Sequence, residues 1–274
     1  MKSSRHKYEK IVYYTYEPTE DNKAHASPIL MIHGHGGDHR GLEALARELN
    51  RYIVIPDLPG FGESEEIENH SIENYVKSLK ALVTNLELSS YVAVGHSLGS
   101  AVALSLARSD SRMDLLVLIN PVPEFSDTLR SLVQKVNAVG NKIPTKYADA
   151  LVKAHLYNLA TFLMHSRKRT DPRQAKKYLT EQKQAKYSFK TWSESGDSIY
   201  RLNQMEIAKQ ITIPTLVMHA DSDTLTSLED IRTYTGLFAD ASLAHVAKAG
   251  HFLPLEQPTT TANIINIFLD KHRV

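Results

Sequence analysis

YVAVGHSLGS, at positions 91–100, is the stretch that decides the fold of this chain. Its first four residues suit a buried strand, and a helix is expected to begin near Leu98. Between strand and helix lies G-x-S-x-G, a pattern that places its central Ser97 on a sharp turn as an exposed nucleophile. Such a turn needs small residues two positions to either side, which Gly95 and Gly99 supply. The alternative is a purely structural turn between a strand and a helix.

The serine requires two partners. A hydroxyl is a poor nucleophile at neutral pH, so it needs a base within hydrogen-bond reach and a carboxylate that orients the base. His251 is the predicted base, since it follows the last predicted strand and its loop can return to Ser97. Asp223 is the predicted acid, because it follows the strand at 215–219, where open α/β sheets carry functional groups. Asp221 is the competing acid, and Asp223 could instead cap the following turn.

An oxyanion hole needs two main-chain N–H groups directed at the developing charge. One comes from the residue after the nucleophile, which is Leu98. The second is expected from His35, in the glycine-rich run MIHGHGG at 31–37. The alternatives for this run are a structural turn and a metal site on His33 and His35; we expect no metal.

Composition and charge exclude other classes of protein. The chain has 274 residues, 42% of them hydrophobic, and suits a packed globular core. Because it contains no cysteine, disulfides, thiolate metal sites and a thiol nucleophile are excluded. A formal net charge of +1 predicts no nucleic-acid partner. No window approaches the roughly 20 apolar residues of a membrane span, and no signal peptide is evident, so we expect a cytoplasmic protein without membrane insertion. The oligomeric state stays open.

Apolar periodicity predicts strands and helices on both sides of a different middle segment. Strands are expected at 11–16, 29–33, 52–55, 91–94, 115–119, 215–219 and 243–246, and helices over 72–86, 228–238 and 259–271. This alternation is typical of an α/β fold with a mostly parallel sheet covered by helices.

The middle of the chain lacks the strand pattern. Lys-rich helices are predicted over 147–169 and 172–190, the second with Asp171 and Pro172 at its start. Residues 122–213 contain 16 Lys and Arg against 8 Asp and Glu, so this segment is basic while the rest is acidic. We therefore predict a helical cap over 122–213, inserted into a core formed by 1–121 and 214–274.

Four motifs in sequence order resemble the capped α/β-hydrolases: HGHGG at 33–37, DLPGFGES at 57–64, GHSLGS at 95–100 and GHFLPLEQP at 250–258. The resemblance covers almost the whole chain apart from the predicted cap. It implies the α/β-hydrolase fold and structural roles for Asp57 and Gly60. In this family the acid usually stands third after a glycine that closes its strand. Ala220 takes the place of that glycine here, with Asp223 in the matching position.

Together these observations predict a serine hydrolase that cleaves a carboxylic ester or thioester. His251 would take the Ser97 proton during attack, an acyl-enzyme would form, and water activated by His251 would release the acid. No metal and no cofactor is required, and the expected partner is a small-molecule ester. The serine excludes relatives that resemble haloalkane dehalogenases and epoxide hydrolases, which carry Asp at this position.

Two alternatives stay open. Carbon–carbon bond hydrolases of the same fold also use serine, although the residue after their histidine is usually Trp, whereas Phe252 stands here. HGHGG and GHSLG are more similar to monoacylglycerol-lipase-like proteins and carboxylesterases. The second alternative is a non-catalytic receptor for a small ligand, which would not require competent residues at all three positions. The acyl and alcohol groups of the substrate are not determined by the sequence.

Overall fold

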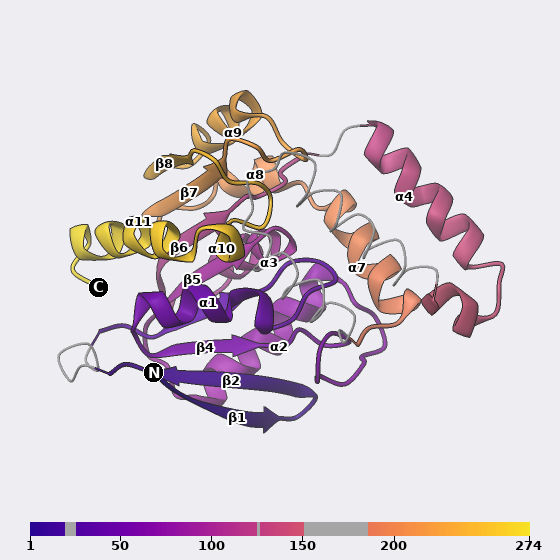
Figure 1. The fold of residues 1–274 in the computed structure, drawn as a ribbon, viewed down its shortest axis with the longest axis horizontal. Helices are drawn as coiled ribbons and strands as arrows, with labels where there is room; N and C mark the ends of the chain where they lie inside the picture. Colours follow the sequence, from indigo (N-terminus) through magenta and orange to yellow (C-terminus); the bar gives the residue numbers. More distant parts are fainter. Residues whose placement is uncertain (20–25, 125–126, 151–185) are drawn as a thin grey trace.

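The structure, a computed structural model, describes residues 1–19, 26–124, 127–150 and 186–274. At its centre lies an eight-stranded sheet in the order β1-β2-β4-β3-β5-β6-β7-β8 (Figure 1). The strands are β1 (Lys2–Tyr8), β2 (Ile11–Glu17), β3 (Ile29–Ile32), β4 (Ile53–Pro56), β5 (Tyr91–His96), β6 (Met113–Ile119), β7 (Thr215–Ala220) and β8 (Ala241–Val246). β2 pairs antiparallel with both β1 and β4, and all other pairs are parallel. The predicted mostly parallel α/β sheet is confirmed.

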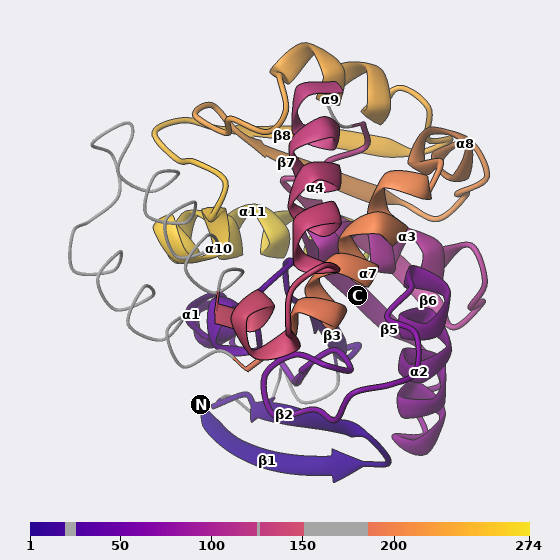
Figure 2. The ribbon, with the colours of Figure 1, turned by 90° about the vertical axis from the view of Figure 1, so that its right-hand side faces the viewer.

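Helices cover both faces of this sheet (Figure 2). They are α1 (Arg40–Leu49), α2 (Ile72–Asn85), α3 (Leu98–Ala107), α9 (Leu228–Thr235), α10 (Leu253–Glu256) and α11 (Pro258–Lys271). Since side chains alternate along a strand, each central strand feeds two cores. In β3, Ile29 and Met31 join the core under α1 and α11, whereas Leu30 and Ile32 join the core under α2 and α3. This two-sided burial explains the continuous apolar runs of the central strands.

The strand β1 and the helix α1 are among the elements that were not predicted from the sequence. β1 has the sequence KSSRHKY and is largely exposed at the sheet edge, so it carries no apolar signal. Its position comes from backbone pairing with β2, from Lys2 opposite Glu17 to Tyr8 opposite Ile11. The helix α1 does bury an apolar stripe against the sheet, although no helix was predicted over its residues.

A helical insertion lies between β6 and β7. Its described helices are α4 (Asp127–Gly140), α7 (Phe189–Arg201) and α8 (Gln204–Ala208), with α4 and α7 side by side in both views (Figures 1 and 2). The helices predicted over 147–169 and 172–190 lie mostly outside the described residues. The end of the helix predicted over 172–190 is wrong. Ser188 has an extended backbone, and its hydroxyl caps a new helix that begins at Phe189. The division into core and cap stays a prediction.

Helix α7 is bound directly to the core through polar contacts. The backbone N–H at the start of α2, on Ile72, donates to Ser198 Oγ at 2.8 Å. Helix α8 packs against α3, with Ile207 and Ala208 in the shared core. Within the described parts of the chain, no helix is both long and apolar enough to cross a membrane.

Candidate active site

Ser97 lies on the predicted turn between β5 and α3. Its backbone has φ 53° and ψ −115°, a strained conformation for a residue with a side chain. A Cβ on Gly95 would collide with the backbone of Gly99, and one on Gly99 would collide with the carbonyl of Ile32 in β3. The turn therefore depends on both glycines, because the start of α3 is pressed against β5 and β3. Ser97 itself stays partly exposed.

The structure brings Ser97, His251 and Asp223 into one hydrogen-bonded chain, which we call the Ser97 cluster. His251 Nε2 lies 3.0 Å from Ser97 Oγ, and His251 Nδ1 lies 2.9 Å from Asp223 Oδ2. Because the ionised carboxylate only accepts, Nδ1 carries the proton and donates it to Asp223. Nε2 is then left as an acceptor for the serine hydroxyl, which is the arrangement a general base requires.

Asp223 is held as an anion. Burial favours its neutral form, but the electrostatic interaction with His251, the hydrogen bond from its Nδ1–H and that from the N–H of Leu225 outweigh this effect and lower the pKa of Asp223. The N–H of Leu225 donates to Asp223 Oδ1 at 2.9 Å, so both carboxylate oxygens have donors. Asp221, the competing acid, accepts a hydrogen bond from Ser222 Oγ at 2.7 Å. The carboxylate bonded to His251 is thus that of Asp223.

The loop that carries His35 runs beside Ser97. A Cβ on Gly34 would lie 3.4 Å from Ser97 Cβ, which places the main chain of this loop against the serine. Leu98 is the first residue of α3, so its N–H has no partner within the helix. Both predicted oxyanion donors therefore belong to segments that adjoin Ser97.

The side chains of the two loop histidines have separate partners. His33 Nδ1 donates to the carbonyl of Gly34 at 2.9 Å, and its Nε2 accepts from Leu58 N at 3.0 Å. His35 Nε2 lies 3.0 Å from the carbonyl of Trp192 in α7, and burial lowers the pKa of His35 to about 4. With both nitrogens of His33 engaged, the geometry does not favour a metal site on this pair.

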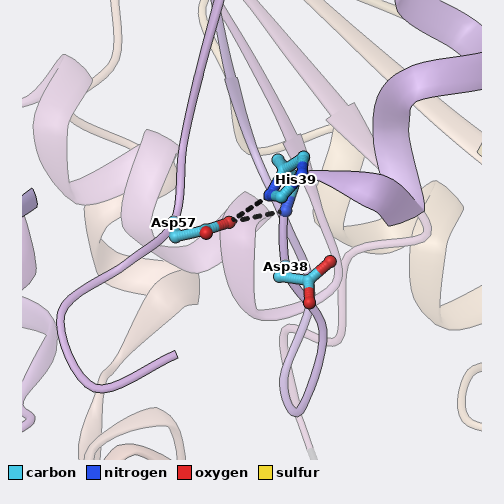
Figure 3. Close-up of side chains that lie close together, drawn as sticks. All are labelled: Asp38, His39 and Asp57. Carbon is cyan, nitrogen blue, oxygen red and sulfur yellow. Dashed lines mark hydrogen bonds and ion pairs between the residues drawn. The ribbon is translucent and has the colours of Figure 1, made fainter. Parts of the chain in front are cut away.

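Among the described residues, a different group has the composition of a cation site. Sequence patterns did not reveal it. Ligand atoms of Asp38, His39 and Asp57 lie within 4.8 Å of one another (Figure 3). However, Asp57 Oδ1 accepts from both the backbone N–H and Nδ1 of His39 at 2.8 Å, and Oδ2 accepts from Glu63 N at 2.9 Å. Asp38 is paired with Arg40. Since protein donors occupy these oxygens, the group suits a structural role better than metal binding.

Two buried polar residues beneath the imidazole loop were also missed. Asn120 directly follows β6, and its Nδ2 donates to the carbonyls of Gly250 and His251 at 3.0 and 2.9 Å. His96 Nε2 donates to the same His251 carbonyl at 2.7 Å. Burial, together with the electrostatic interaction with His251, lowers the pKa of His96 to about 3. A polar residue at the carboxyl end of a buried strand was the available signal for Asn120.

A second group of acid, imidazole and hydroxyl, which we call the His70 cluster, joins the insertion to the core. His70 Nδ1 lies 2.8 Å from Glu194 Oε2, and His70 Nε2 lies 3.3 Å from Thr191 Oγ1. The backbone N–H of His70 also donates to Glu194 Oε2, at 3.0 Å. His70 and Thr191 are each 0% exposed. Sequence patterns did not single out these residues.

Comparison with known proteins identifies one family. A sequence model for the alpha/beta hydrolase fold matches residues 27–258. A biotin biosynthesis bifunctional protein of Teredinibacter turnerae is 24% identical over 263 residues, covering 89% of this chain and 44% of that protein. The chain therefore spans less than half the length of that relative. Lipase 1 of Psychrobacter immobilis is 25% identical and matches over 91% of this chain and 78% of its own length.

Other similar proteins have different activities. A 2-hydroxy-6-oxo-2,4-heptadienoate hydrolase of Pseudomonas putida is 25% identical, with 89% of each chain covered. Among solved structures, a thermophilic esterase from Thermogutta terrifontis superimposes with a TM-score of 0.78 at 21% identity, covering 95% of this chain and 94% of its own. At this identity the structural likeness establishes the fold alone.

Proposed function

The chain belongs to the α/β hydrolase fold family, and we propose that it is a serine hydrolase that cleaves a carboxylic ester or thioester. One observation carries the proposal: His251 bonds to Ser97 Oγ at 3.0 Å and to Asp223 at 2.9 Å. A base with its proton on Nδ1 and its free Nε2 at a strained, accessible serine is suited to deprotonating that serine. The lipase and esterase relatives support an ester as the substrate.

In the proposed reaction, Ser97 Oγ attacks the carbonyl carbon while His251 takes its proton. Asp223 stabilises the imidazolium that forms, and the N–H groups of His35 and Leu98 stabilise the oxyanion. Collapse of the intermediate expels the alcohol or thiol, protonated by His251, and leaves an acyl group on Ser97. Water then attacks the acyl carbon with His251 as base, which releases the carboxylic acid and restores the serine.

The helical insertion is proposed to act as a cap over this site. Residues 122–213 would form the cap and 1–121 with 214–274 the core. The contact of His35 with the Trp192 carbonyl supports this, because it joins helix α7 to the loop beside Ser97. A cap of this kind would select a small-molecule substrate by its shape.

A carbon–carbon bond hydrolase is the second candidate. The observation that favours it is the similarity to the Pseudomonas putida hydrolase, which is named for a heptadienoate and not for an ester. Such a reaction would use the same serine, so an inactive serine variant cannot separate the two functions. A panel that contains both ester and diketone substrates separates them by rate.

The experiment is fluorophosphonate labelling combined with hydrolysis of p-nitrophenyl esters of increasing acyl length. We expect Ser97→Ala to fold normally, to lose all labelling and to lose about 10⁴-fold or more in kcat. Ser109→Ala is the matched control, because Ser109 lies two residues beyond the end of α3, the helix that Ser97 precedes. This variant should label and hydrolyse like the wild type. Near wild-type ester hydrolysis by Ser97→Ala would refute the proposal. Tight ligand binding with no turnover of any ester would favour a receptor.

A further inference from the structure

Asn120 lies at the carboxyl end of a central strand of the sheet. It follows β6, which lies between the strand that leads to Ser97 and the strand that leads to Asp223. The residue is 0% exposed and has φ 44°, a left-handed conformation that Asn tolerates better than most residues. Its backbone N–H donates to the carbonyl of Met218 in β7 at 2.9 Å. The side chain is thereby held at one point among three strand ends.

The amide of Asn120 connects the segment bearing the acid to the loop bearing the base. Its Oδ1 accepts from Ala220 N at 2.9 Å, and the Ala220 carbonyl in turn accepts from Asp223 N at 3.0 Å. Its Nδ2 donates to Gly250 and to the carbonyl of His251 itself. One side chain thus bonds the turn that carries Asp223 and the backbone that carries His251.

These bonds use both N–H donors of the carboxamide and one acceptor site on its oxygen. Two donors and one acceptor are needed at the same time, which neither an acid nor an apolar residue of that size supplies. The carbonyl of His251 also accepts from His96 Nε2 at 2.7 Å, so two buried donors fix its position. The backbone under the imidazole is therefore constrained from β5 and from β6.

We propose that Asn120 is a positioning residue that sets the separation of the His251 loop from the Asp223 turn, and so keeps the imidazole aligned with Ser97. This inference rests on the proposed function of the Ser97 cluster. Asn120 acts through the backbone of its neighbours and touches no reacting atom. Because a misplacement of about 1 Å can cost about 10²-fold in rate, loss of these bonds should slow acylation without weakening substrate binding.

Two substitutions test the role from different sides. Asn120→Gly removes the side chain and keeps the left-handed backbone without strain. Asn120→Asp keeps the size and the acceptor for Ala220, but in alkaline assays it presents a carboxylate oxygen to the two carbonyls. Asn50→Gly and Asn50→Asp are matched controls, since Asn50 also has a left-handed backbone, with φ 50°, and accepts a backbone hydrogen bond from Thr19 far from the site.

The readouts are kcat and KM for an ester that the wild type hydrolyses, the rate of fluorophosphonate labelling, and the low-field proton resonance of the His251 Nδ1–H. Rates are divided by the concentration of folded protein. For both Asn120 variants we expect about a 10²-fold loss in kcat and in labelling rate, a nearly unchanged KM, and a shifted or broadened resonance. Both Asn50 variants should match the wild type in all four measurements.

The outcomes separate this inference from the proposed function. If the wild type neither hydrolyses esters nor labels at Ser97, the proposed function fails. If the wild type is active and folded Asn120 variants keep wild-type kcat and resonance, only the positioning role fails. A change confined to KM, or a failure of both variants to fold, would assign Asn120 to substrate binding or to stability and would also overturn the inference.

Discussion

The Ser97 cluster and the His70 cluster contain the same three chemical groups in different surroundings. In each, a carboxylate lies within 2.9 Å of a histidine Nδ1, and a hydroxyl faces Nε2. The hydroxyls differ most. Ser97 stands partly exposed on a strained turn at the start of α3, whereas Thr191 is fully buried in the first turn of α7. A substrate carbonyl can therefore reach only the first.

The surroundings of Nε2 also differ between the two imidazoles. His70 Nε2 lies near the N–H of Ile67 as well as Thr191, at 3.4 and 3.3 Å, while Thr191 Oγ1 can donate to Glu66 Oε1 at 3.3 Å. The hydrogen bonds of the His70 cluster thus hold the insertion to the core. Acid, imidazole and hydroxyl within reach do not by themselves make a reactive site; access, backbone strain and nearby N–H donors are needed as well.

Removing the acid should affect kcat very differently in the two clusters. Asp223→Asn should lower kcat by about 10⁴-fold, since the imidazole loses the partner that fixes its tautomer and stabilises its charge. Glu194→Gln should leave kcat within a few-fold of the wild type. Steady-state ester hydrolysis measures both. Asp221→Asn serves as the near-neighbour control, and a loss at Asp221 equal to that at Asp223 would reverse the assignment of the acid.

Removing the imidazole of the His70 cluster should affect stability instead of chemistry. His70→Leu leaves Glu194 and Thr191 without their shared partner at a buried junction. We expect a loss of about 2 kcal/mol in the free energy of unfolding, measured by urea denaturation, with kcat per folded molecule nearly unchanged. A variant as stable as the wild type would show that the junction contributes little to holding the insertion in place.

Acid titration should reveal the histidines that are buried without a carboxylate partner. The folded pKa values of His35 and His96 are lowered from 6.5 to about 4 and about 3, so between these values and pH 6.5 each histidine is neutral when folded and binds a proton on unfolding. Their contribution to stability is complete above pH 6.5 and is lost as the pH falls toward the folded values. The unfolding free energy should drop by up to about 1.4 kcal/mol per pH unit for each histidine. His35→Gln should flatten this slope, and an unchanged slope would contradict it.

Local sequence determined much of the fold. Strands such as β5 and β6 are buried on both faces and therefore leave apolar runs, and the turn at Ser97 leaves its two glycines. The order of Ser97, Asp223 and His251 along the chain, each after a predicted strand, also follows from local patterns. The structure brings these three together as predicted, while their catalytic roles stay a proposal. β1 left no such trace, because an exposed edge strand is held by backbone bonds to its neighbour.

Tertiary structure alone decided which polar groups meet. Asn120 and His251 are 131 positions apart, and His70 and Thr191 are 121 positions apart. No periodicity or turn preference encodes such pairs, since they depend on which strand ends become neighbours in the sheet and on where the insertion packs. Sequence patterns thus identify the strained serine and its candidate partners. Only packing separates the accessible hydroxyl of Ser97 from the buried one of Thr191, because solvent access and the direction of backbone N–H groups are properties of the folded chain.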